Sequence, residues 1–223
     1  MKEVSIVSFS DTHNLHRMVQ LSKCDISIFG GDFSGRGSRN DTEDFMDWYN
    51  KQNQCDYKIM VAGNHDLCFD PKYNRETGAN FWLSDMLKKY PDIIYLENDS
   101  VNILGLWIWG SPITPDFYPQ HWAFNKSRGE TIKEYWDKIP KDTDIIVTHG
   151  PPEFIGDRCD DGHVGCKDLA DTITRIKPKL HISGHIHEGY GSIQIENTAY
   201  LNVSVCDKHY RALNLPILST ITL

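Results

Sequence analysis

The sequence lacks long apolar runs and any leader-like segment. Its N-terminus passes directly from Met1 into the short apolar stretch of residues 4–9, without a basic segment, a longer apolar segment and a small-residue cleavage site in succession. The longest apolar runs fall far short of the ~20 residues that a membrane-spanning helix needs. We therefore predict a soluble, cytoplasmic protein with no membrane partner.

Paired cysteines are lacking as well. The 6 cysteines are scattered without CxxC spacing, and a chain of 223 residues can bury a core that needs no disulfides. We expect reduced thiols. A disulfide or a structural zinc site involving Cys159 and Cys166 is the less favoured alternative, because only their closeness in sequence supports it.

Clustered positive charge is the third absence. The chain has 23 Lys and Arg against 31 Asp and Glu, which gives a net charge of -8, and it contains no long basic run. Proteins that bind nucleic-acid backbones rely on clustered Lys and Arg, so this composition argues against long nucleic acid as a partner. A small phosphorylated substrate remains compatible, because metal ions can meet its charge locally.

Short apolar runs rich in β-branched residues alternate with helical patterns along the chain. Strands are predicted over residues 4–9, 25–29, 57–62, 144–148 and 180–183. Helices are predicted over residues 41–53, 79–90, 128–139 and 166–176, with Asn40, Gly78 and Ser127 as caps. Hairpin patterns at residues 93–109 and 190–205 add antiparallel pairs. The pattern predicts one α/β domain over residues 1–223, with mixed sheets.

Acidic, amide and imidazole side chains follow the end of each predicted strand, which is where α/β folds place their sites. Seven of them are candidate metal ligands: Asp11, His13, Asp32, Asn64, His149, His185 and His187. In an extended segment residues i and i+2 point the same way, so Asp11 with His13, and His185 with His187, can face one cavity. Each motif alone is weak, and their joint occurrence in order carries the prediction.

Imidazole, carboxylate and amide ligands in one set favour transition metals, with manganese preferred and iron, zinc or cobalt as alternatives. Seven ligands exceed what one catalytic ion with an open position can hold, so we predict two divalent ions that share Asp32. The positive charge of two divalent ions exceeds the negative charge of Asp11 and Asp32. The excess positive charge is available to phosphate oxygens. This chemistry favours phosphoester hydrolysis by a metal-bridging hydroxide.

In order, these motifs resemble those of the calcineurin-like metallophosphoesterase superfamily, from Asp11 to His187. A narrower likeness to the MPPED-type metallophosphodiesterases rests on residues 9–13, 122–125, 148–152, 184–191 and 202–204. Asp66 departs from that group, which usually has Glu there. The resemblance implies a four-layer αββα sandwich of two mixed β-sheets, with the metal site at the C-terminal ends of the strands. It also implies one ion at Asp11, His13, Asp32 and His187 and a second at Asp32, Asn64, His149 and His185.

The resemblance and the ligand set together predict a phosphodiesterase for small substrates, with cyclic nucleotides suggested by resemblance alone. His65 is not assigned as a ligand of either ion. We therefore hypothesise that it protonates the leaving oxygen, with Asp66 as a supporting partner. A phosphomonoesterase or a nuclease with the same centre is the alternative. A non-catalytic scaffold on this fold is less favoured, because every expected ligand is present.

An aromatic loop is predicted over residues 111–128. It carries Phe117, Tyr118, His121, Trp122, Phe124 and Arg128. These side chains could stack a nucleobase or contact a phosphate. We favour packing for most of them, because Trp and Phe bury large apolar areas and a long loop needs anchoring.

Overall fold

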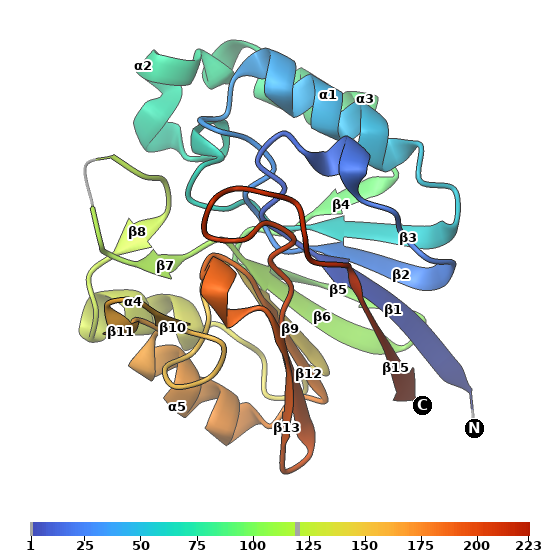
Figure 1. Cartoon of the computed structure of the whole chain (residues 1–223), viewed down its shortest axis with the longest axis vertical. Coiled ribbons are helices and arrows are strands. Elements are labelled where there is room, and N and C mark those ends of the chain that lie inside the picture. The colour runs from blue at the N-terminus through green and yellow to red at the C-terminus, as the bar shows by residue number, and fades with distance from the viewer. Residues whose placement is uncertain (1, 119–120) are drawn as a thin grey trace.

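The computed structural model describes residues 2–118 and 121–223, and two β-sheets packed face to face form its centre (Figure 1). The first sheet has the order β15-β1-β2-β3-β4. It consists of β1 (Glu3–Phe9), β2 (Cys24–Phe29), β3 (Cys55–Met60), β4 (Ile93–Tyr95) and β15 (Ile217–Thr222). Strands β1 to β4 are parallel, and β15 is antiparallel to β1.

The second sheet has the order β13-β14-β12-β9-β6-β5. It consists of β5 (Asp99–Ile103), β6 (Leu106–Ser111), β9 (Ile145–Thr148), β12 (Leu180–Ser183), β13 (Gly191–Ile195) and β14 (Thr198–Asn202). The four inner strands are parallel, whereas β5 and β13 pair antiparallel with their neighbours. Both sheets are therefore mixed, as predicted.

Helices cover the outer face of each sheet, with α1 (Arg39–Asn50) and α3 (Leu83–Lys89) on the first and α4 (Glu130–Trp136) and α5 (Lys167–Ile176) on the second (Figure 1). Shorter elements fill the connections: η1 (His16–Met18), η2 (Leu67–Phe69), η3 (Pro71–Tyr73), α2 (Asn74–Thr77), η4 (Ala79–Phe81), β7 (Thr114–Pro115), β8 (Asn125–Lys126), β10 (Arg158–Cys159), β11 (Gly162–His163) and η5 (His187–Gly189). The predicted αββα sandwich is confirmed.

Apolar side chains are buried on both faces of the central strands. This explains why the sequence of these strands is almost continuously apolar. Along β2, Ile26 and Ile28 belong to the core between the two sheets. Phe29 faces the other way and packs against Phe45 of α1, with ring centres 4.6 Å apart. Alternation along an extended strand thus buries both sets of side chains, as expected for parallel strands between covering layers.

Several predicted boundaries are wrong in detail. Helix α1 begins after Ser38, whose Oγ accepts the N–H of Asp41 at 3.1 Å, so Ser38 is the cap instead of Asn40. The cap of α4 is Gly129, not Ser127. The predicted helix over residues 79–90 is split at Trp82 into η4 and α3. Strand β4 joins the first sheet beside β3 instead of forming a hairpin with β5.

Two further observations concern disulfides and membrane-spanning helices. All six cysteines, which lie in the described part of the chain, are free thiols. Within residues 2–118 and 121–223, no helix combines the length and the apolar character that crossing a membrane requires.

Candidate metal centre

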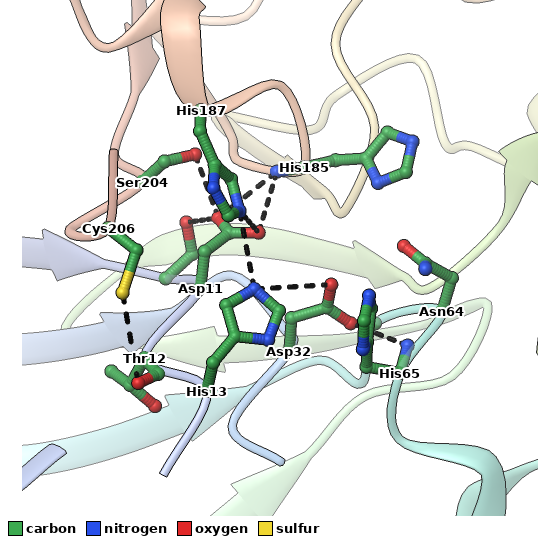
Figure 2. A network of polar contacts seen from close by, with 12 residues as sticks. Asp11, Thr12, His13, Asp32, Asn64, His65, His185, His187, Ser204 and Cys206 are labelled. Carbon is green, nitrogen blue, oxygen red and sulfur yellow. Dashed lines mark hydrogen bonds and ion pairs between the residues drawn. The ribbon is translucent and has the colours of Figure 1, made fainter. Parts of the chain in front are cut away.

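The seven predicted ligands lie together where the strands end. Figure 2 labels six of them, and His149 lies 2.9 Å from Asn64 Oδ1. Asp11 and His13 follow β1, Asp32 follows β2, Asn64 follows β3, His149 follows β9, and His185 and His187 follow β12. Asp11 and His149 are fully buried, and Asp32 and Asn64 are each 2% exposed. Because these strands are parallel within their sheets, their C-terminal ends share one edge of the sandwich, which brings the side chains into contact.

The candidate ligand atoms fall into neighbouring groups, and Asp32 lies between two of them. Asp11, His13 and His187 form one group of atoms within 4.8 Å of one another, and Asp32, His149 and His185 form another. His13 Nε2 lies 4.0 Å from Asp32 Oδ2, and His149 Nε2 lies 3.3 Å from the same oxygen. A third group of His13, Asp32 and His65 overlaps both. The geometry thus brings together all seven residues singled out in the sequence.

Backbone carbonyls orient the imidazoles of this centre. The Nδ1 atoms of His13, His149 and His187 lie 3.3, 2.8 and 2.9 Å from the carbonyl oxygens of Ser34, Gly30 and Asp207. Each Nδ1 therefore donates its hydrogen to a carbonyl, which leaves Nε2 for the centre. Histidine ligands of metals are held in this way, because the second ring nitrogen fixes the tautomer and the ring orientation.

The charges of the centre are balanced among its own side chains. Burial disfavours the ionised form of Asp11, but the hydrogen bond and charge of His187 outweigh this effect and hold the pKa of Asp11 below its usual range. Burial also opposes a charge on His149, yet the neighbouring Asp32 raises the pKa of His149 to about 9. Two buried carboxylates beside nitrogen donors are thus kept ionised by nearby positive charge. These residues fit divalent cations, which would supply that charge.

The backbone is left-handed at four of the ligands. Asp11, His13, Asp32 and His185 have φ values of 54°, 41°, 61° and 67°. Non-glycine residues seldom adopt this conformation, and such residues concentrate at functional sites, where the surrounding structure imposes them. The strand ends are thus bent sharply so that each side chain turns into the centre.

Two glycines allow the strand ends to approach one another closely. A Cβ on Gly63 would overlap Oδ1 of Asp32, and a Cβ on Gly184 would overlap Oδ2 of Asp11. Neither glycine could carry a side chain without displacing one of these carboxylates. The glycines beside the ligand motifs therefore serve close packing of the carboxylates.

His65 and Asp66 occupy different places in the centre. The His65 ring lines the cavity beside Asp32 and Asn64, and its Nδ1 lies 2.8 Å from the carbonyl oxygen of Gly35. Asp66 is fully buried beneath Asp32, and its Oδ2 accepts a hydrogen bond from the backbone N–H of Asp32 at 2.8 Å. Within the described residues, no hydrogen bond joins Asp66 to the His65 ring. Asp66 therefore supports the Asp32 backbone, in contrast to the partnership with His65 expected from the sequence.

Residues of the C-terminal segment complete the centre and were missed by the sequence analysis. Ser204 Oγ lies 2.8 Å from Asp11 Oδ2, which also accepts a hydrogen bond from Ser10. The Tyr210 ring packs against that of His13, with centres 4.8 Å apart. The sequence signal for Ser204 is the stretch at residues 202–204 that supports the narrower resemblance, and Tyr210 lies outside that stretch.

Two adjoining cavities open at the centre. One, of about 300 Å³, is lined by Asp32, Asn64, His65 and Trp122 among others. The second, of about 550 Å³, extends past Asp116, Arg128 and Asp161. Both are lined by Phe117, Tyr118, His185, Ile186, Glu188 and Tyr210, so they form one continuous hollow.

The predicted aromatic loop divides into packed and exposed side chains. Phe124 is 4% exposed and Trp122 is half-buried, which confirms packing for these two. Phe117 and Tyr118 are 41% and 65% exposed and face the hollow. Residues 119–120 of this predicted loop lie outside the described residues.

Comparison with known proteins identifies the family. A model of the calcineurin-like phosphoesterases matches residues 4–189. The chain belongs to this family. Metallophosphoesterase domain-containing protein 1 of Homo sapiens is 35% identical over 229 residues, which cover 95% of this chain and 69% of that protein. A UPF0046 protein of Caenorhabditis elegans is 32% identical over 218 residues, which cover 96% of this chain and 74% of that protein.

These relatives confirm the resemblance read from the motifs. Among solved structures, TT1561 of Thermus thermophilus has a TM-score of 0.61 at 12% identity, covering 90% of this chain and 89% of that chain, and shows the same fold. Membership of the calcineurin-like phosphoesterases implies hydrolysis of phosphoesters with divalent metal ions, for which this chain has the ligand groups.

Proposed function

We propose that this chain hydrolyses phosphodiester bonds of small substrates with two divalent transition metal ions, manganese being preferred. The observation that carries the proposal is the position of Asp32, which belongs to the group with His149 and His185 and lies 4.0 Å from His13 of the group with Asp11 and His187. One ion would be held by Asp11, His13, Asp32 and His187 and the other by Asp32, Asn64, His149 and His185. When bound, such a pair of cations lowers the pKa of a water molecule and neutralises charge on the phosphate.

The chain's own residues would orient the substrate and deliver a proton. Because Nδ1 of His65 is committed to the Gly35 carbonyl, Nε2 is the nitrogen left to give a proton to the leaving oxygen. The backbone N–H of His65 also donates to Asp32 Oδ1 at 2.8 Å, so the proton donor and the shared carboxylate are held at a fixed separation. General acid catalysis of this kind contributes ~10²–10⁴-fold to a rate.

The continuous hollow favours a diester over a monoester. It extends beyond the metal ligands in both cavities, which leaves room for an organic group on each side of the phosphate. Its outer part is lined by Asp116, Asp161 and Glu188. Arg128, the basic residue there, already donates to the carbonyls of Val164 and Gly165. Lys208, which lines the inner part, pairs with Asp160 at 3.0 Å. The acidic side chains of the hollow therefore outnumber its basic ones, which disfavours the second negative charge of a monoester more than the single charge of a diester.

The exposed aromatic rings support a nucleotide as the substrate class. Phe117 and Tyr118 line both cavities, and aromatic side chains stack on nucleobases without a preference for sequence. The net charge of -8 argues against a long nucleic acid. A small nucleotide diester such as a cyclic nucleotide satisfies both observations.

The first test is hydrolysis of bis(p-nitrophenyl) phosphate and p-nitrophenyl phosphate by metal-stripped protein resupplied with manganese. Manganese-dependent cleavage that favours the diester, and is lost in Asp32→Asn, supports the proposal. Asp85→Asn is the matched control, because the side chain of Asp85 is 84% exposed in an ion pair with Lys88. Preference for the monoester would replace the proposal by a phosphomonoesterase. Inactivity with manganese, zinc, iron and cobalt in folded protein would favour the scaffold alternative.

A further inference from the structure

Trp122 lies directly against His65. The two ring centres are 4.1 Å apart and the ring planes are inclined by 33°, so the indole covers a face of the imidazole. Trp122 lines the same cavity as Asp32 and Asn64. In that cavity the indole thus packs against the side chain to which we assign proton donation.

The hydrogen bond to Gly35 alone does not fix the His65 ring. A single bond between Nδ1 and a carbonyl oxygen, here 2.8 Å long, lets the ring tilt about that bond. His13 contacts the ring nearly edge-on, with centres 4.7 Å apart and planes at 74°. Tyr210 lies farther away, with ring centres 6.3 Å apart. Trp122 makes the nearest ring contact with His65, and tilting the imidazole would drive it into the indole.

Trp122 is itself tied to the segment that follows His65. Its carbonyl oxygen accepts the hydroxyl hydrogen of Tyr73 at 2.7 Å. The N–H of Ala123 donates to the carbonyl of Asn64 at 3.0 Å, and that of Phe124 donates to Asp70 Oδ2 at 2.9 Å. One of these bonds reaches Asn64, directly before His65, and the other two reach Asp70 and Tyr73 in the segment after it, so residues 122–124 are tied to the chain on both sides of His65.

We propose that Trp122 is a positioning residue that holds the His65 imidazole with Nε2 directed at the leaving oxygen. This inference rests on the proposed function. In the reaction a hydroxide derived from water forms the new P–O bond as the bond to the leaving oxygen breaks. The electron pair of the broken bond stays on that oxygen, which takes the proton of His65 Nε2. Trp122 thus matters most where the leaving oxygen needs a proton.

The test is a series of methyl aryl phosphates whose leaving phenols become steadily less acidic, from p-nitrophenyl to p-methoxyphenyl, hydrolysed by manganese-loaded full-length protein. Misplacement of a catalytic group by about 1 Å can cost ~10²-fold. We expect Trp122→Ala to lower kcat for the p-methoxyphenyl ester by ~10- to 100-fold and for the p-nitrophenyl ester by less than ~3-fold. His65→Ala should show the same selective loss, and Trp122→Phe should retain most of the wild-type rate.

The double variant separates positioning from substrate binding. If Trp122 acts through His65, then Trp122→Ala lowers the rate no further in the His65→Ala background. Trp122→Leu keeps the apolar bulk without the flat ring, and Trp107→Ala replaces a tryptophan that is 43% exposed on β6, so it should match the wild type. Bound manganese should be equal in all these proteins.

A uniform loss across the ester series, or a further loss in the double variant, would overturn the positioning role and assign Trp122 to substrate contact. No hydrolysis of any ester by the wild-type protein would overturn the proposed function, and this inference with it. The two failures are therefore distinguishable.

Discussion

The carboxylate of Asp66 lies beneath Asp32 and accepts four hydrogen bonds. Its Oδ2 accepts the N–H groups of Asp32 and Gly63 at 2.8 and 2.9 Å. Its Oδ1 accepts the N–H and the hydroxyl of Ser34 at 3.2 and 3.0 Å. One fully buried side chain thus joins the turns after β2 and β3, which carry Asp32, the proposed shared ligand, and Asn64.

Replacing Asp66 by asparagine should weaken both the fold and the centre. The amide nitrogen would face N–H groups that need an acceptor, and an unpaired buried donor costs ~1–3 kcal/mol. We expect Asp66→Asn to lower the free energy of unfolding by about that amount and to weaken manganese binding, measured by urea denaturation and by calorimetric titration. Asp85→Asn should change neither, and equal stability of both variants would contradict the assigned role.

Ser204 should tune the metal affinity through Asp11. Its hydroxyl lies 2.8 Å from Asp11 Oδ2 and 2.9 Å from Asn202 Oδ1. Groups that orient a ligand carboxylate typically contribute ~10- to 100-fold to metal affinity. We expect Ser204→Ala to weaken manganese binding within this range, measured by titration of metal-stripped protein. Ser192→Ala, an exposed serine on β13, is the control. Unchanged affinity in Ser204→Ala would show that Ser10 suffices.

Gly63 should tolerate no side chain. A methyl group there would overlap the Asp32 carboxylate and its backbone nitrogen, so Gly63→Ala must displace the Asp32 side chain. We expect manganese-dependent diester hydrolysis to fall by at least ~10²-fold. Gly35→Ala is a matched control, because its added Cβ would meet only Asn14 Nδ2, at 3.9 Å, and the Gly35 carbonyl remains. Full activity of Gly63→Ala would refute the close approach seen here.

His181 should make stability depend on pH below neutrality. The single hydroxyl hydrogen of Thr148 goes to the carbonyl of Gly150 at 2.7 Å, so His181 Nε2, at 2.9 Å, must be the donor to Thr148. Burial lowers the pKa of His181 to about 3. Because the unfolded chain binds a proton near pH ~6.5, this residue contributes no pH dependence above that value.

Between pH ~6.5 and about 3 the unfolded state binds more protons at His181, so acidification destabilises the fold by ~1.4 kcal/mol per pH unit from this residue. We expect the stability of His181→Leu to fall less steeply over this range. Chemical denaturation of both metal-free proteins at several pH values measures the difference. Parallel curves would mean that His181 is protonated in the folded state.

The local sequence contains much of the fold and the chemical identity of the centre. Alternation of apolar residues sets which face of each strand is buried. The sequence also predicted that Asp11 and His13 share a cavity, but the reason given was wrong, because both residues follow β1 in a left-handed backbone instead of an extended one. Glycines beside the ligands mark close approaches. The candidate ligands adjoin strands, so local patterns alone single them out.

Pairings between distant segments depend on how the two sheets are packed, and only the tertiary structure decides them. His149 Nδ1 forms a hydrogen bond with the carbonyl oxygen of Gly30, and Asp11 forms one with Ser204. The Trp122 ring packs against that of His65. Helix ends also escape prediction, because Ser38 and Asn40 are both capping residue types. The sequence by itself determined the buried strands and the seven candidate ligands that follow them, because local periodicity encodes strands, and the resemblance of the motifs implied the sandwich. The orientation of each candidate ligand needed the folded chain, because long-range contacts leave no local pattern.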